Sequence, residues 1–236
     1  MMAPGKTLRS DGVETRARLK EEAQRLFALR GLEGVSVQDI ISAAGQRNSA
    51  SLRYYFGNKL ELARELVVDG AQLIDEDRQA RLNKLEAEGG ITVRAVLGAL
   101  TFPMLDLAER TGQATYIRMI ANLQLNNRPF LREALEDKWN HGYRRCNALL
   151  RELLPYVPPA IVDHRLSLVG IYGNAALAAW EASKDSGEPG RLWSPHFAMS
   201  NLMDTFESIL VSDPSGETKS LLTDSESERK SRHRRA

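Results

Sequence analysis

Polar side chains with strong hydrogen-bond donors gather between residues 36 and 59 of this chain. They are Ser36, Arg47, Asn48, Ser49, Ser51, Arg53, Tyr54, Tyr55 and Lys59. Hydroxyl, guanidinium and ammonium groups bind phosphate oxygens, and arginine and asparagine can also pair with the edges of guanine and adenine. The residue types in this stretch therefore predict contacts with DNA.

Their spacing divides these residues into two groups. Ser36 and Lys59 lie at predicted helix starts, where free backbone N–H groups and the helix dipole favour an anion. Arg53, Tyr54 and Tyr55 lie between these two starts, and tyrosine and arginine are common contacts to the DNA backbone. We expect phosphate contacts from all five. The candidates for base contacts are Arg47, Asn48, Ser49 and Ser51.

Three short helices must position these side chains. Apolar residues recur at helical spacing over Glu14–Arg30, and Ser36 with Asp39 fits a capping box that opens a second helix. The small residues Ala43-Ala44-Gly45 then form a turn before a third helix. This order matches a helix-turn-helix. The alternative is an ordinary three-helix core without a DNA role. The residues expected to be buried are Leu19, Ala23, Leu26, Phe27, Val37, Ile40, Ile41, Ala44, Leu52 and Phe56.

The remainder of the chain is predicted to be helical, because the alternation typical of strands is missing. Asn58 opens a long helix that runs to about Glu88, where two glycines end it. Residues 1–12 and 213–236 carry too little apolar surface to fold, so we expect a flexible arm and a disordered tail. Further helices are predicted over Thr92–Arg110, Gln113–Leu125, Pro129–Leu154, Pro159–Ser183 and Ser194–Val211.

The composition argues against several classes of protein. A formal net charge of +1 gives no overall preference for nucleic acid, so only a local basic surface could bind it. The single cysteine, Cys146, excludes an internal disulfide framework. No apolar run approaches the roughly 20 residues that a membrane span needs. We therefore expect a cytoplasmic protein that has no membrane association.

Catalytic chemistry finds little support in the sequence. Cys146 and His141 lie on one predicted helix, separated by about 140° around its axis, so they cannot easily form a nucleophile–base pair. The four histidines show no metal-ligand spacing, and no glycine-rich loop could hold a phosphate cofactor. The sequence therefore predicts neither an enzyme nor a metal or cofactor site.

The segments SVQDIISAAG and LRYYFGNKLEL resemble the signature of the TetR family of transcriptional regulators. The family pattern runs T/S-V-x-x-I-A-x-A-A-G, then L-Y-Y-Y/H-F and a lysine, and the similarity covers about Thr15–Leu66. Arg53 stands where a tyrosine is common, and the turn GQRNSAS is one residue longer than the usual form. Arg47 and Asn48 are therefore presented differently from the family's usual residues. The resemblance implies that phosphates are held by Ser36, Tyr54, Tyr55 and Lys59.

The resemblance also implies a pocket for a small effector in the C-terminal region. Pro103 lies inside a predicted helix and should kink it, which could open a cavity. The alternative is that the aromatic and apolar residues of this region form a plain core. The residues that could line a pocket are Phe102, Met104, Leu105, Tyr116, Met119, Leu123, Trp139 and Tyr143.

The last two predicted helices of the C-terminal region carry small residues beside large apolar ones. Small faces allow close helix packing, and two such helices from each of two chains would form a four-helix bundle. Packing within the chain itself is the alternative. The residues predicted for a homodimer interface are Gly170, Ile171, Gly173, Ala176, Leu177, Trp180, Met203 and Phe206.

The sequence thus predicts an all-α protein. Residues 13–66 would form a helix-turn-helix DNA-binding domain, residues 67–212 a helical effector-binding and dimerisation domain, and residues 213–236 the tail. The predicted function is a transcriptional regulator, a homodimeric repressor that a small molecule releases from its double-stranded DNA operator. The alternatives are a ligand-independent DNA-binding protein and a helical small-molecule-binding protein without a DNA role.

Overall fold

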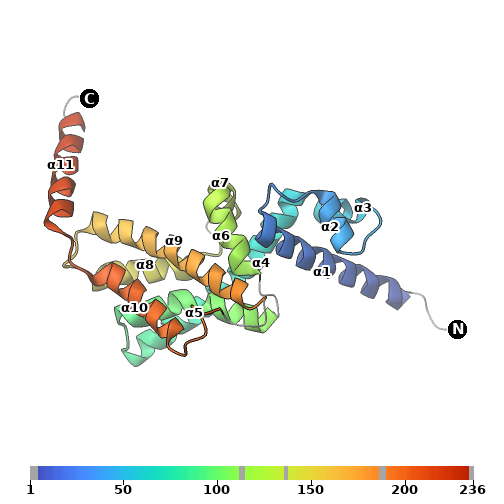
Figure 1. Ribbon diagram of the computed structural model, residues 1–236, viewed down its shortest axis with the longest axis horizontal. Coiled ribbons are helices and arrows are strands. Elements are labelled where there is room, and N and C mark those ends of the chain that lie inside the picture. The colour runs from blue at the N-terminus through green and yellow to red at the C-terminus, as the bar shows by residue number, and fades with distance from the viewer. Residues whose placement is uncertain (1–4, 112–114, 136–137, 186–189, 234–236) are drawn as a thin grey trace.

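The computed structural model describes residues 5–111, 115–135, 138–185 and 190–233, which contain eleven helices and no strand (Figure 1). The all-α prediction is confirmed. The helices are α1 (Gly5–Arg30), α2 (Val37–Ala43), α3 (Ala50–Phe56), α4 (Lys59–Glu88), α5 (Val93–Thr111), α6 (Tyr116–Asn126), α7 (Arg128–Ala134), α8 (His141–Leu153), α9 (Pro159–Ser183), α10 (Ala198–Val211) and α11 (Gly216–His233).

Helices α1, α2 and α3 form an N-terminal unit at one end of the molecule (Figure 1). The predicted capping box opens α2, because Ser36 Oγ accepts from the backbone N–H of Asp39 and the Asp39 carboxylate accepts from the N–H of Ser36. Gly45 ends α2 in the left-handed region at φ 66°, and the N–H of Gln46 bonds to the carbonyl of Ile41. This Schellman turn fixes the angle between α2 and α3.

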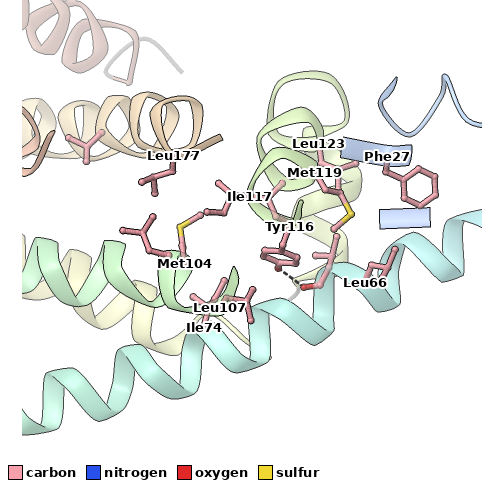
Figure 2. Packing of buried hydrophobic residues seen from close by; sticks show 14 of the residues in the cluster. Phe27, Leu66, Ile74, Met104, Leu107, Tyr116, Ile117, Met119, Leu123 and Leu177 are labelled. Atoms are coloured by element: carbon pink, nitrogen blue, oxygen red, sulfur yellow. Dashed lines mark hydrogen bonds between the residues drawn. The ribbon is translucent and has the colours of Figure 1, made fainter. Parts of the chain in front are cut away.

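Helix α4 runs from the N-terminal unit into a helical body made of α5 to α10 (Figure 1). Asn58 caps its start, since Asn58 Oδ1 accepts from the N–H groups of Leu60 and Glu61. Gly89, at φ 67°, ends it as predicted. The hydrophobic core is continuous along α4: Phe27 of α1 and Leu123 of α6 belong to one buried cluster with α4 (Figure 2). The N-terminal unit is therefore joined to the body by packed side chains as well as by the chain.

Several predicted boundaries differ from the structure, among them the start of α10, which is Ala198 and not Ser194. Helix α1 begins at Gly5, so a flexible arm over residues 1–12 is wrong for the described residues. Gly12, inside this helix, lies against the Tyr55 hydroxyl; a Cβ there would come within 3.2 Å of that oxygen. The glycine that suggested a break instead allows a close contact. The predicted start at Gln113 lies outside the described residues, and α6 begins at Tyr116.

The predicted helix Pro129–Leu154 is two helices, α7 and α8. The start of α8 is set by α4: Gly142 donates its N–H to Asp75 Oδ1 at 2.7 Å, and a Cβ on Gly142 would lie 2.7 Å from Arg78 Cβ. This contact between distant segments overrides the continuous helical pattern of the sequence.

The tail is also different from the prediction, because residues 216–233 form α11, which stands away from the body (Figure 1). Ser215 caps this helix by accepting from the N–H of Thr218 at 3.2 Å, and Leu222 packs half-buried against the core. The expectation of disorder rested on the small apolar content. A cap and good helix formers give local order without a large buried face.

Candidate nucleic-acid interface

One edge of α3 and the turn before it presents polar side chains to solvent. Leu52 and Phe56 anchor α3 in the core, which directs Arg53 and Tyr54 outward; Tyr54 is 82% exposed. Arg47, Asn48 and Ser49 in the turn are exposed as well. Within the described residues, no recorded hydrogen bond or ion pair occupies the Arg47 or Arg53 guanidinium or the Tyr54 hydroxyl. Their donors are available to a partner. We call Arg47, Arg53 and Tyr54 the open edge.

Two other predicted base-contact residues are partly used by the turn itself. Asn48 Oδ1 accepts from the N–H of Ala50, the first residue of α3, at 2.8 Å. Ser51 Oγ donates to the carbonyl of Asn48 at 2.7 Å. These contacts use the amide oxygen of Asn48 and leave its amide nitrogen available to a partner, whereas the hydroxyl proton of Ser51 is engaged.

Ser36 and Lys59, predicted phosphate contacts, have internal partners. Ser36 Oγ donates to Asp39 Oδ2 at 2.6 Å, and this bond lowers the pKa of the Asp39 carboxyl. Lys59 Nζ donates to the carbonyls of Leu32 at 2.8 Å and Val35 at 2.9 Å. Lys59 thereby ties the loop after α1 to the start of α4. The position of Lys59 at a helix start did not predict these two hydrogen bonds to backbone carbonyls.

Tyr55 differs from its neighbour Tyr54. The Tyr55 ring meets the Tyr54 ring edge-on, with centroids 4.9 Å apart, and its hydroxyl lies beside Gly12 of α1. Tyr55 is half-buried and packs against the core. The Tyr55 ring thus supports the Tyr54 ring on the side of the core, while Tyr54 faces solvent.

The residues predicted to line an effector pocket are dispersed. Met104, Met119 and Leu123 are buried in the core (Figure 2). Leu105 is buried as well, and Tyr143 is exposed. Phe102 and Trp139 are half-buried. A cavity of about 510 Å³ lies instead between α1 and α4, closed by Leu107 of α5 and Tyr116 of α6. Tyr116 is the one predicted pocket residue in its lining.

The residues predicted for a dimer interface divide into buried and exposed ones. Gly173, Leu177, Met203 and Phe206 are buried within their own chain, so these four residues do not lie on the surface of a single chain. A Cβ on Gly173 would lie 3.3 Å from the Phe206 ring, so the small residue serves packing inside the chain. Ile171 is exposed, and Gly170, Ala176 and Trp180 are partly exposed.

The exposed side of α9 carries a different apolar stripe. Leu168, Ile171, Ala175 and Ala179 follow one another at helical spacing and all are exposed. The periodicity that marks this stripe was visible in the sequence. The sequence did not show which of the two apolar sides of α9 faces α10.

Groups that could carry catalysis are inert here. Cys146 is buried, and burial raises the pKa of its thiol to about 11, which keeps it protonated at neutral pH. Over the described ranges, no three His, Cys, Asp or Glu side chains come together as metal ligands. The helices described are too short or too polar to cross a membrane.

Comparison with known proteins assigns the N-terminal segment. Residues 20–66 match the family model of the bacterial regulatory proteins, tetR family. This match covers the C-terminal part of α1, all of α2 and α3, and the start of α4, and so includes the open edge. No curated protein sequence matches the chain.

Several solved structures share the fold. They include a TetR family transcriptional regulator, PfmR, from Thermus thermophilus (19% identity, 82% of this chain and 97% of that chain covered, TM-score 0.50). A putative tetR family transcription regulator from Shewanella has 16% identity, 83% and 95% coverage and a TM-score of 0.50. The probable transcriptional regulatory protein RHA5900 has 19% identity, 84% and 100% coverage and a TM-score of 0.53. At these identities the likeness concerns the fold.

Proposed function

We propose that this chain, which belongs to the TetR family of bacterial regulatory proteins through residues 20–66, is a sequence-specific DNA-binding transcriptional regulator. The observation that carries the proposal is the open edge. Arg47, Arg53 and Tyr54 leave their donors to solvent on one side of α3, while Leu52 and Phe56 hold the other side in the core. Such a helix can enter a major groove with its polar edge against bases and phosphates.

The roles within the open edge follow from side-chain chemistry. Arg47, in the turn before α3, is placed to pair with a guanine edge, and the free amide nitrogen of Asn48 suits a base acceptor. Arg53 and Tyr54, one turn further along α3, suit phosphate oxygens. Ser36, Tyr55 and Lys59 act mainly by fixing the elements around α3, although backbone N–H groups at the start of α2 can still meet a phosphate.

A homodimer would give the affinity that a single small unit lacks. We assign its interface to the exposed stripe of α9, with Leu168, Ile171, Ala175 and Ala179 facing the same residues of a second chain. Paired helices would then place two copies of α3 in successive major grooves, about 34 Å apart, on a pseudo-palindromic operator. In this scheme residues 13–66 bind DNA and residues 67–212 regulate and dimerise.

Repression that a small molecule relieves is the mode of regulation we infer. An effector can release the operator only if it binds one arrangement of the two N-terminal units better than the other. The continuous core between α1, α4 and α6 provides a physical route, because a shift of α6 or α4 must move α1. The protein would work in the cytoplasm, on its operator.

The test is selection of duplexes from a random DNA library by the full chain, followed by measurement of affinity against salt. A sequence-specific regulator enriches a pseudo-palindrome, and the logarithm of its affinity falls linearly with the logarithm of salt concentration. Arg47→Ala should relax the preference at one base position by about 1–3 kcal/mol. The matched control is Arg151→Ala in α8, an arginine ion-paired with Asp163, which should change nothing in DNA binding.

Failure has a clear form. If no sequence is enriched, or if Arg151→Ala and Arg47→Ala weaken binding equally, the open edge does not read DNA. If a duplex is bound but no small molecule alters the affinity, the protein is a ligand-independent DNA-binding protein. If only small molecules bind, it is a ligand-binding protein without a DNA role.

A further inference from the structure

The cavity between α1 and α4 lies where the N-terminal unit meets the body. Its lining combines residues of α1 and α4 with Leu107 of α5 and Tyr116 of α6. A volume of about 510 Å³ falls within the range of small-molecule sites. A molecule held there would touch the N-terminal unit and the body at the same time.

The inner wall of the cavity is apolar. Leu66, Leu107 and the Tyr116 ring are buried around it, and Gly70 lets the Tyr116 ring lie directly on α4 (Figure 2). The Tyr116 hydroxyl is committed to the carbonyl of Val67 at 2.9 Å, and burial raises its pKa far above the usual range. Tyr116 therefore offers the cavity an uncharged ring.

The outer wall of the cavity includes Arg16, Lys20 and Asp69, which belong to a seam of ion pairs between α1 and α4 that Glu65 completes behind the wall. Arg16 Nη2 contacts Glu65 Oε1 at 2.5 Å, and Lys20 Nζ contacts the same oxygen at 2.8 Å and also the Asp69 carboxylate. Burial opposes ionisation of Glu65, but the bonds from Lys20 and Arg16 hold its pKa below the usual range. Glu65 is thus firmly held between two cations.

Asp69 is the replaceable member of this seam. Its side chain is 52% exposed, so it can be hydrated once released, whereas Lys20 is 17% exposed. In the part of the chain that the structure describes, Lys20 is the recorded ion-pair partner of Asp69. An incoming anion can take the place of Asp69 on Lys20 Nζ at small cost. An incoming cation would be attracted by Asp69 but would also lie near Arg16 and Lys20, so two positive charges of the lining oppose it.

We propose that this junction cavity binds an amphipathic monocarboxylate, with its carboxylate on Lys20 in place of Asp69 and its apolar body against Leu73, Leu107 and Tyr116. The molecule would separate Asp69 from α1 and bridge α1 to α5 and α6. Its effect on the operator rests on the proposed function; its binding to the cavity does not. Because coupling between two ligands is reciprocal, operator DNA must then change the affinity for the carboxylate by the same factor.

The test is calorimetric titration of the full chain with octanoate, octanol and octylamine, which share one apolar chain and differ in charge. Octanoate should bind once per chain and about tenfold more tightly than octanol, the size of one hydrogen bond to a charged group. Octylamine should bind more weakly than octanol. Octylamine binding as tightly as octanoate, or no binding of octanoate at millimolar concentration, overturns the proposal.

Variants of the two walls locate the binding. Lys20→Met should remove the roughly tenfold advantage of octanoate over octanol. Asp69→Asn, which removes the carboxylate that competes for Lys20 and leaves the pair with Glu65, should strengthen octanoate binding several-fold. Leu73→Trp from α4 and Ala17→Phe from α1 each fill the cavity and should abolish binding of both molecules. Circular dichroism checks that each variant is folded. Octanoate binding that survives both filling variants lies elsewhere and refutes the site.

A final arm separates this proposal from the proposed function. Octanoate is added to the chain on its selected duplex, and DNA affinity is measured by fluorescence anisotropy. An affinity change that Lys20→Met removes supports an effector role. Octanoate binding without any change in DNA affinity overturns that role while leaving DNA binding itself intact.

Discussion

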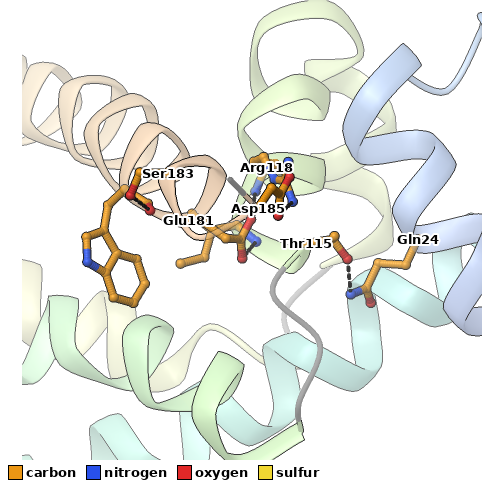
Figure 3. A network of polar contacts seen from close by, with 8 residues as sticks. Gln24, Thr115, Arg118, Glu181, Ser183 and Asp185 are labelled. Atoms are coloured by element: carbon orange, nitrogen blue, oxygen red, sulfur yellow. Dashed lines mark hydrogen bonds and ion pairs between the residues drawn. The ribbon is translucent and has the colours of Figure 1, made fainter. Parts of the chain in front are cut away.

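Two polar clusters of this molecule, the open edge of α3 and the start of α6, differ in whether their side chains have partners within the chain. At the start of α6 every principal group has an internal partner: Glu181 accepts from the N–H groups of Ile117 and Arg118, at 3.1 and 2.9 Å, and Gln24 donates to Thr115 Oγ1 at 2.9 Å (Figure 3). On the open edge, Arg53 and Tyr54 face solvent.

The two clusters also differ in what they join. Glu181 comes from α9 and Gln24 from α1, so the start of α6 links the exposed α9 helix to the N-terminal unit (Figure 3). Buried polar groups with satisfied bonds specify one arrangement, and their loss leaves charges or N–H groups without partners. Exposed donors without partners add little to stability and remain available for binding. Variants at the start of α6 should therefore lower stability, and variants of the open edge should lower DNA affinity.

The largest effect is expected at Glu181, whose side chain is fully buried. Glu181→Ala removes the acceptor of two α6 N–H groups and a contact to Arg118, and should lower the free energy of unfolding by about 3–5 kcal/mol. Urea unfolding measures it. Asp185→Ala is the control, since Asp185 also binds Arg118 but is half-exposed, and should cost under about 1 kcal/mol. Equal losses of unfolding free energy in the two variants would mean that the buried bonds of Glu181 do not stabilise the start of α6 more than an exposed ion pair does.

Helix α9 offers a second contrast, between its buried and exposed sides. Leu177→Ala should cost about 2–5 kcal/mol of stability, because Leu177 is in the core. Ile171→Asp, on the exposed stripe, should leave the unfolding of the monomer almost unchanged but separate the dimer. Sedimentation velocity measures the mass. A dimer that persists with Asp at position 171 excludes this stripe as the interface.

Lys59 tests whether a polar residue near the open edge is structural. Lys59→Met removes two bonds from a charged group to the carbonyls of Leu32 and Val35, and should lower stability by about 2 kcal/mol. Lys84→Met, on the exposed far part of α4, should cost less than about 0.5 kcal/mol. Thermal unfolding compares the two. If Lys59→Met reduces DNA affinity and leaves stability unchanged, Lys59 belongs with the open edge.

Arg53 should behave in the opposite way. Arg53→Ala should weaken binding to the selected duplex and lower the dependence of log affinity on log salt by about one, as expected for one lost phosphate contact. Its unfolding free energy should match that of the unmodified protein within about 0.5 kcal/mol. A salt dependence that is unchanged would remove Arg53 from the phosphate contacts.

The smallest effect concerns Ser36 and pH. The Ser36 bonds lower the pKa of Asp39, so the carboxylate adds stability above its unfolded pKa near 3.8, and this stability is lost as the pH falls through the lower folded pKa. Ser36→Ala should move the Asp39 pKa back up towards 3.8. An NMR titration of the Asp39 carboxyl measures it. An unaltered titration would show that Ser36 does not set the charge at the start of α2.

Local signals in the sequence predicted most of the helices. The capping box at Ser36, the cap at Asn58 and the glycine at position 89 each depend on a few neighbouring residues, and the structure has all three. Pro159–Ser183 was predicted with the same bounds as α9. These helix caps and bounds could be predicted because the residues that determine them lie within one or two helical turns of each other.

Features that depend on distant partners were missed. Lys59 finds two carbonyls more than twenty positions away, and Leu177 points into the core of its own chain (Figure 2). The junction cavity needs α1, α4, α5 and α6 together, so no spacing along the chain could mark Asp69 or Leu107 as its lining. The residue types of the open edge were visible in the sequence, but which of its donors remain without an internal partner was not.

The central claim is that the open edge contacts DNA and is not needed for folding, and Tyr54 tests it most directly. Tyr54→Ala is compared with the unmodified chain for two quantities, affinity for the selected duplex and free energy of unfolding. We predict that affinity falls about tenfold, the size of a lost hydrogen bond with its ring contact, while the unfolding free energy changes by less than about 0.5 kcal/mol. An unchanged affinity, or a loss of affinity that only accompanies unfolding, would contradict the account.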